Sequence, residues 1–162
     1  MKPGDHPDFY RFAPPPGTSR ESTIVLDREG RFFHDGQRVV HPALEKGLRS
    51  WIALHPDDGR PILTNGYDWC YFHVDATPFF VKSVAGDAAP EAVLSDGSTE
   101  ALDPATLRLD IDGALIARVK RGAFDARFTT SAQLEVGRWL ADDDPPRLVV
   151  EGRSYPLAAP PQ

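Results

Sequence analysis

Sulfur is scarce in this sequence, and no long apolar run occurs in it. One cysteine, Cys70, among 162 residues leaves no second thiol for an internal disulfide and too few thiols for a zinc ribbon. No stretch reaches the roughly 18 consecutive apolar residues that a membrane-spanning helix requires, and the first residues lack the apolar run of a signal peptide. We expect a soluble, cytoplasmic protein that holds no metal and does not insert into a membrane.

Positive charge is also in short supply. The chain carries 18 Lys and Arg against 24 Asp and Glu, for a net charge of −6, and the acidic residues are spread along the sequence. A nucleic-acid binder needs a basic surface that faces the phosphates, so we expect no nucleic-acid partner. The length and the hydrophobic content of 41% suffice for one good core or for two small cores that share an interface.

The two ends of the chain are rich in proline. Residues 1–22 contain five prolines before Gly17, a composition that resists both helix and strand, so we predict an extended N-terminal arm. Its aromatic residues are able to dock on a surface; they are Phe9, Tyr10 and Phe12. Residues 158–162 are predicted to be a flexible C-terminus.

The first half of the body, residues 23–86, combines a hairpin, a helix and further strands. Asp35-Gly36 is a strong hairpin signal because both residues tolerate a positive φ. A helix is predicted from Pro42 to Leu54, since proline suits a first helical turn and apolar residues recur at helical spacing. The apolar positions of this helix are Leu44, Leu48, Trp51 and Ile52. Strands are predicted at residues 61–64, 69–74 and 79–84.

The second half, residues 87–157, is built from similar parts. Asp112-Gly113 lies at the tip of a second predicted hairpin. Thr130 and Gln133 have the spacing of a capping box, which predicts that a helix begins there. The apolar positions of this helix repeat the spacing of the first and are Ala132, Val136, Trp139 and Leu140.

The two helical segments resemble each other near their ends. Arg49 and Trp51 correspond to Arg138 and Trp139, and an acidic turn that contains proline follows each pair. This predicts an α+β fold of two related strand-rich halves, each with one amphipathic helix packed on antiparallel strands, and a cleft between the halves. The alternative is that a helix face with tryptophan and an acidic turn recur by chance.

Three short segments carry a resemblance to a known family. They are Arg31 to Gly36, Val74 to Phe79 and Phe124 to Phe128, and they resemble in order and spacing the signatures of the bacterial domain of unknown function 1285 family. The resemblance covers about residues 23–157. It implies a duplicated α+β architecture whose second half is superficially like a pleckstrin-homology fold. The family has no established reaction, so the resemblance implies a binding or signalling module.

One predicted strand carries most of the candidate binding residues. Alternation along residues 68–75 places two aromatic rings, a histidine and a carboxylate on one side, a mixture that suits stacking on a flat ligand while bonding to its polar edge. These residues are Trp69, Tyr71, His73 and Asp75. The alternative is that this side fills an interface between the two halves.

Two more candidates lie outside that strand. His34 precedes the Asp35-Gly36 turn and belongs to the first family signature; the alternative is that it bonds to the backbone of the turn. Arg127 points out of a predicted strand and suits either a ligand carboxylate, bound in bidentate fashion, or an acidic group within the protein. Cys70 is expected to be a buried, small apolar residue.

No complete catalytic motif accompanies these residues. A nucleophile elbow, a glycine-rich phosphate loop and a His-Glu-x-x-His helix are all missing, and no cofactor is implied. The leading hypothesis is therefore a non-enzymatic module that binds a small molecule or a protein. One alternative is a small hydrolase or lyase that uses His73 or His34 with Asp75, and another is an interaction module that uses sheet edges or the N-terminal arm.

Overall fold

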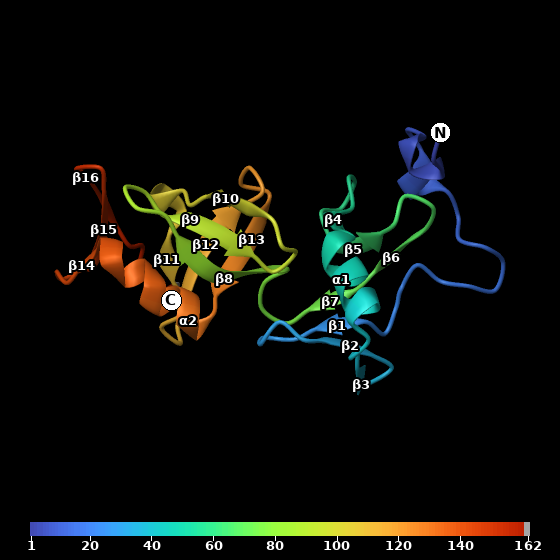
Figure 1. Ribbon diagram of the computed structural model, residues 1–162. Helices are drawn as coiled ribbons and strands as arrows, with labels where there is room; N and C mark the ends of the chain where they lie inside the picture. Colours follow the sequence, from blue (N-terminus) through green and yellow to red (C-terminus); the bar gives the residue numbers. More distant parts are fainter. Residues whose placement is uncertain (161–162) are drawn as a thin grey trace. The chain divides into compact units, whose positions relative to one another are not determined.

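The structure of this chain, a computed structural model, describes residues 1–160 (Figure 1). It consists of two compact units: one comprises Met1–Ala76, and the other begins at Thr77. Strands are numerous and helices few, so the predicted α+β class is confirmed. The sequence put the boundary after residue 86, whereas strand β8 (Phe79–Ala85) pairs with strands of the second unit.

The first unit contains a four-stranded sheet in the order β3-β2-β1-β7. Its strands are β1 (Val25–Leu26), β2 (Phe32–His34), β3 (Gln37–Arg38) and β7 (His73–Val74). The predicted hairpin joins β2 to β3: Asp35 and Gly36 have φ of 51° and 79°, which is the type I′ turn that suits twisted strands. Strand β7 pairs with β1 in parallel.

A helix and a three-stranded meander complete the first unit. They are α1 (Pro42–Ser50), β4 (Ile52–Leu54), β5 (Pro61–Thr64) and β6 (Trp69–Tyr71). The His41 side chain accepts a hydrogen bond from the Leu44 amide and starts the helix. The sequence extended this helix to Leu54, but Ile52 pairs with Leu63 in the sheet, so strand pairing overrides the apolar pattern.

The N-terminal arm is more ordered than the sequence predicted. It forms two short 3₁₀ turns, η1 (Pro3–Asp5) and η2 (Phe9–Arg11), and the Gly4 amide donates to the Gly66 carbonyl at 2.7 Å. Phe9 is buried, because its ring gains more from contact with the sheet than the proline-rich backbone loses on ordering.

The second unit contains a six-stranded sheet in the order β10-β9-β8-β13-β12-β11. Two antiparallel meanders, β8-β9-β10 and β11-β12-β13, meet at the parallel pair β8 and β13. The bounds of the remaining strands are β9 (Glu91–Leu94), β10 (Thr99–Ala101), β11 (Arg108–Leu109), β12 (Leu115–Val119) and β13 (Phe124–Phe128), and a short turn η3 (Pro104–Thr106) precedes β11.

A helix and a second small meander follow this sheet. They are α2 (Thr130–Val136), η4 (Gly137–Trp139), β14 (Leu140–Ala141), β15 (Arg147–Val150) and β16 (Arg153–Pro156). The helix cap is Thr129, whose hydroxyl accepts from the Ala132 amide, one residue earlier than the predicted capping box. Gln133 instead accepts from the Leu115 amide, because that donor of β12 lies within its reach.

Each unit therefore contains a helix, a tryptophan at its end and a three-stranded meander. Trp51 caps α1 and precedes β4, and the buried Trp139 ends η4 and precedes β14. The likeness of the second half to a pleckstrin-homology fold stays a prediction. Of the predicted flexible C-terminus, Ala158 is tied to Leu107 and Leu109 by backbone hydrogen bonds, and residues 161–162 lie outside the described residues.

Candidate functional site

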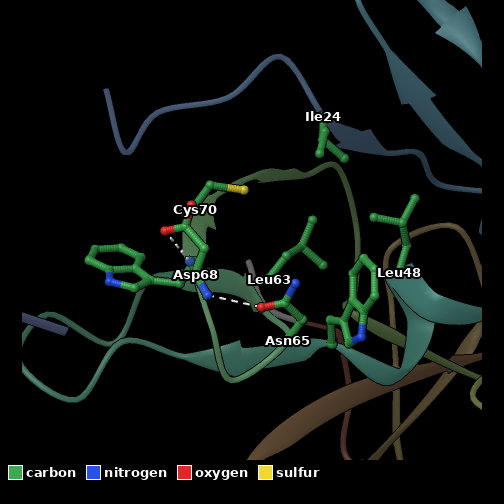
Figure 2. Close-up of a pocket in the computed structure, with 8 residues that line it drawn as sticks. Ile24, Leu48, Leu63, Asn65, Asp68 and Cys70 are labelled. Carbon is green, nitrogen blue, oxygen red and sulfur yellow. Dashed lines mark hydrogen bonds between the residues drawn. The ribbon is translucent and has the colours of Figure 1, made fainter. Parts of the chain in front are cut away.

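The first unit has a pocket of about 180 Å³ on one face of the β4-β5-β6 meander (Figure 2). Leu63 and Cys70 are cross-strand partners on this face, and alternation turns their neighbours Ile62 and Tyr71 to the other face. Helix α1 adds Leu48 and Trp51. The full lining is Ile24, Leu48, Trp51, Leu63, Asn65, Asp68, Trp69 and Cys70.

The walls of the pocket are largely apolar. Figure 2 shows Ile24, Leu48 and Leu63 directed toward a common space. Ile24 reaches it because the segment that leads into β1 runs along β6 and β7: the Tyr71 amide donates to the Arg20 carbonyl at 2.7 Å, and the His73 amide donates to the Ile24 carbonyl at 2.9 Å. The pocket therefore exists because α1 and this segment cover the face incompletely.

One rim of the pocket is polar and fixed in place. The Asn65 side chain accepts from the amides of Tyr67 and Asp68, both at 2.9 Å, which holds the turn between β5 and β6. The Asp68 carboxylate accepts from Arg20 Nη1 at 2.5 Å and from the Trp69 amide at 2.9 Å. Its side chain is nevertheless 68% exposed, so the rim presents a carboxylate to solvent.

Cys70 contributes a protonated thiol. Burial raises the pKa of this thiol above its ordinary value, and the thiolate is the reactive form. The residue is half-buried and lines the pocket, so the expected small apolar role is close to what the structure shows.

The opposite face of the same meander carries an aromatic cluster. Trp69 and Tyr71 lie on it, and His55, which is buried, packs against both rings with centroids 5.0 and 5.6 Å away. His55 Nδ1 accepts from the Asp57 amide at 3.1 Å, and Nε2 lies 3.0 Å from the Tyr10 carbonyl. This pattern assigns the proton to Nε2, because Nδ1 must accept.

His55 is the residue that the sequence analysis missed. It follows β4 and precedes the acidic pair Asp57 and Asp58, and none of the sequence patterns pointed to it. A signal was available in the sequence: the three apolar residues Ile52 to Leu54 directly precede His55 and are enough to form a short strand.

Tyr71 takes part in a charged network at the edge of this cluster. Its hydroxyl donates to Asp58 at 2.6 Å, and this bond raises the pKa of Tyr71 and lowers the pKa of Asp58. The Arg60 guanidinium lies 3.7 Å from the centroid of the Tyr71 ring and also pairs with Glu21. Asp58, Arg60 and Glu21 are thus already paired within the protein, so a charged ligand would have to compete with these contacts.

The four residues predicted to share one strand face do not lie on one strand, and Asp75 lies in a bend just after β7. Trp69 and Tyr71 belong to β6, whereas His73 belongs to β7, and Phe72 between them is buried. His73 Nε2 lies 2.9 Å from the Asp75 carboxylate, and their side chains are 69% and 42% exposed. The break arises because β7 leaves the meander to pair with β1.

His34 and Arg127 stand apart from that group. His34 is exposed, 3.6 Å from the carboxylate of its neighbour Asp35. Arg127 lies in the second unit on a pocket of about 330 Å³ beside α2, where its guanidinium bonds to Asp110 at 3.3 Å and to Asp112 at 2.5 Å. Of the two roles considered for Arg127, the structure shows the pairing within the protein.

No helix within residues 1–160 has the length and apolar character needed to cross a bilayer. Nor do three or more His, Cys, Asp or Glu side chains of these residues come together in a way that could hold a metal ion.

Solved structures with the same fold are known. A DUF1285 family protein from Silicibacter pomeroyi DSS-3 matches with a TM-score of 0.68 and 17% identity, over 85% of this chain and 80% of that one. A second, from Shewanella baltica OS155, matches with a TM-score of 0.54 and 14% identity, over 69% of this chain and 87% of that one. No protein-family model and no curated protein matches the sequence. This chain thus has the fold of the solved proteins of the domain of unknown function 1285 family, the family that its sequence motifs resemble.

Proposed function

We propose that this protein is a non-enzymatic binding module and that the pocket on the α1 side of the meander takes a small, mainly apolar ligand. The observation that carries the proposal is the pocket beside the cross-strand pair Leu63 and Cys70, of which Cys70 is half-buried. A dry apolar cavity of roughly 150 Å³ is known to bind benzene. The pocket of about 180 Å³ therefore suits one aromatic ring or one branched aliphatic group.

The polar rim narrows the class of ligand. The Asp68 carboxyl pairs with Arg20 but is 68% exposed, so it favours a hydrogen-bond donor or a protonated amine at the outer end of the ligand and disfavours a carboxylate there. An aromatic or aliphatic amine combines both requirements. Such a ligand would place its apolar group between Leu48 and Leu63 and its amine toward Asp68.

The chemistry of the lining supports binding without reaction. The pocket contains no histidine or lysine among its described residues, and burial keeps the Cys70 thiol protonated by raising its pKa. A nucleophile without an adjacent base is weak.

Binding is tested by a screen with defined probes. Indole, phenol, tyramine and phenylacetate are added to the full chain, and melting temperature and tryptophan fluorescence are recorded. A ligand of the folded state raises the melting temperature by mass action, so tyramine is expected to raise it and phenylacetate to have a smaller effect.

Two variants locate the site. Cys70→Leu fills the pocket and is expected to abolish the shift, whereas Leu134→Ala, at an exposed residue on the pocket of the second unit, should leave it unchanged. The opposite pattern, or no shift with any probe, contradicts the proposal.

A second candidate function rests on one contact. His73 Nε2 and the Asp75 carboxylate lie 2.9 Å apart, which is the distance needed for a carboxylate to orient a catalytic base. A small hydrolase that uses this pair would cleave an activated ester, p-nitrophenyl acetate, at a rate that falls in His73→Ala and persists in His34→Ala. Equal rates in all three proteins exclude it.

The recurrence of helix, tryptophan and meander in both units supports an origin by duplication. Figure 1 lets the reader compare α1 and β4 to β6 with α2 and β14 to β16. A role in signal transduction, which the family resemblance implies, is part of the same proposal. It requires a ligand or partner, and the screen supplies the first test.

A further inference from the structure

The aromatic face of the β4-β5-β6 meander is covered by the first twelve residues of the protein. From here on, the arm means these twelve residues alone and no longer the whole of residues 1–22. Phe9 packs with Ile62 and Trp69 in a buried cluster, and the Tyr10 ring meets Trp69 edge-on with centroids 5.9 Å apart. Arg11 donates two hydrogen bonds to Asp57, at 2.6 and 3.0 Å. This is a specific docking site for an aromatic-aromatic-arginine segment.

The seven residues that connect the arm to the body are docked far less well. Residues 13–19 are exposed except for Pro14, which is half-buried. A pocket of about 470 Å³ lies where this connection and the arm pass Arg20, Tyr67 and Asp68. In Figure 1 the chain between η2 and β1 forms a wide loop. Little apolar area holds this connection in its present course.

The composition of the connection opposes the reversal of direction that it makes. Pro14, Pro15 and Pro16 favour an extended chain. The turn depends on Gly17, whose φ of 79° is a conformation that other residues adopt only with strain, and the Thr18 amide closes the turn on the Pro15 carbonyl.

Two buried donors lie near the place where the connection rejoins the body. Arg20 Nε and Trp69 Nε1 are buried and have no hydrogen-bond partner among the described residues, and the Arg20 guanidinium lies 4.6 Å from the Trp69 ring centroid. Trp69 is 6% exposed. An unsatisfied buried donor is destabilising, and one of the two belongs to Arg20, the residue directly after the connection.

We propose that the aromatic face is an interface between two copies of this chain, in which each copy docks its arm on the meander of the other. Reciprocal exchange keeps every contact of Phe9, Tyr10 and Arg11 and changes only the connection, which becomes extended. The equilibrium between the closed monomer and the exchanged dimer then depends on two quantities. One is the free energy of the Gly17 turn, and the other is the protein concentration. The proposal does not rest on a ligand in the pocket of Leu63 and Cys70, although Trp69 borders both that pocket and the aromatic face.

A charge exchange provides the first test. Arg11→Asp and Asp57→Arg are made as separate full-length proteins. Alone, each places like charges at the docking site in both closed and exchanged forms, so each is expected to be monomeric by light scattering. Mixed, the two copies form one native and one reversed ion pair across the exchanged dimer. A heterodimer in native mass spectrometry, with one variant labelled by ¹⁵N, is the expected result.

The hinge provides the second test. Gly17→Ala penalises the closed turn by a left-handed strain equivalent to roughly tenfold in an equilibrium constant. It is expected to strengthen the dimer of the otherwise unchanged chain by at least about tenfold. Gly97→Ala is the matched control, since Gly97 has φ of 88° and open space around it but lies in the second unit.

The outcomes separate the possibilities. A mixture that stays monomeric, together with a Gly17→Ala protein that stays monomeric at millimolar concentration, overturns the proposal and leaves the arm as an intramolecular strap. A dimer that forms equally in Gly97→Ala and Gly17→Ala overturns the role of the hinge. A heterodimer in the mixture with a stronger Gly17→Ala dimer supports exchange.

Discussion

The two faces of the β4-β5-β6 meander differ in how they are covered. On one, Ile62 is fully buried under Phe9 and the neighbouring rings of the arm. On the other, Leu63 is also buried, at 4% exposed, but the half-buried Cys70 beside it borders the pocket. The strand register is the same for both, so the difference comes from what covers each face: flat rings that close tightly on one, and a short helix that leaves a gap on the other.

The residues that cover each face explain why the pocket lies on the α1 side. The arm brings its own aromatic residues and completes a small core, as its contacts with His55, Trp69 and Tyr71 show. Helix α1 buries only Leu48, and Leu44 on the same apolar stripe stays 46% exposed. A face with too few covering residues is a candidate binding surface.

The largest expected effect compares two adjacent residues of β5. Ile62→Ala opens a cavity in a fully covered core and should lower the free energy of unfolding toward the upper end of about 2–5 kcal/mol, whereas Leu63→Ala should lie near the lower end. The physical reason is that Leu63 borders the pocket and therefore has fewer packing contacts to lose. Urea unfolding of both variants measures the difference, and equal losses would mean that the faces are equally packed.

A second prediction concerns the arm itself. Phe9→Ala should cost about 2 kcal/mol, less than the 3–5 kcal/mol of a typical buried phenylalanine, because the arm can undock while the rest of the unit stays folded. Hydrogen exchange at the Gly4 amide, which bonds to Gly66, reports undocking. Slow exchange in the variant would show that Phe9 is not what holds the arm.

Enlarging one small residue on each face gives a third, smaller effect. Cys70→Leu should change stability by less than about 1.5 kcal/mol, since the pocket has room for the added atoms. Ala53→Leu, on the face that the arm covers, should instead displace the arm and speed exchange at Gly4. A larger loss of stability in Cys70→Leu than in Ala53→Leu would reverse the comparison.

The smallest effect is a pH dependence of arm docking. Hydrogen bonds from Arg11 lower the pKa of Asp57, so the contribution of this pair is complete above the ordinary carboxyl pKa of about 3.9 and is lost as pH falls through the lower folded value. The NMR shift of the Gly4 amide should therefore be constant from pH 7 to pH 5 and move below pH 4. In Asp57→Asn this movement should shrink; an unchanged profile assigns it to another carboxyl.

Local signals predicted the elements that depend on neighbours in sequence. The Asp35-Gly36 hairpin forms as expected, and β5 spans the predicted residues 61–64. The end of α1 was not predicted, because Ile52 continues a helical apolar pattern but pairs with Leu63 in the sheet. The strands β9 and β10 were missed although they pair locally, as a hairpin whose turn contains Gly97.

The candidate site was predicted only in part, for the same reason. Of the candidate binding residues only Trp69 lines the pocket, and its neighbour there, Cys70, was expected to be a core residue. Alternation alone extended one face from Trp69 to Asp75, and no local pattern signals that the strand divides at Phe72 to join β1. The aromatic surface was also foreseen, as was the ability of Phe9 and Tyr10 to dock. That they dock on that surface depends on contacts between residues about fifty positions apart, which periodicity does not contain.

The parallel pairing of β8 with β13 has a consequence for how the second unit folds. Each of its meanders, β8-β9-β10 and β11-β12-β13, is made of contacts between neighbours in sequence, whereas β8 and β13 meet only after the whole intervening chain has been synthesised. The chain must lose the entropy of closing this long loop before the contacts between β8 and β13 can stabilise it. Val81 and Phe128, partners in this pairing, should thus be among the last residues to gain their native contacts, and the two meanders should form as separate early structures.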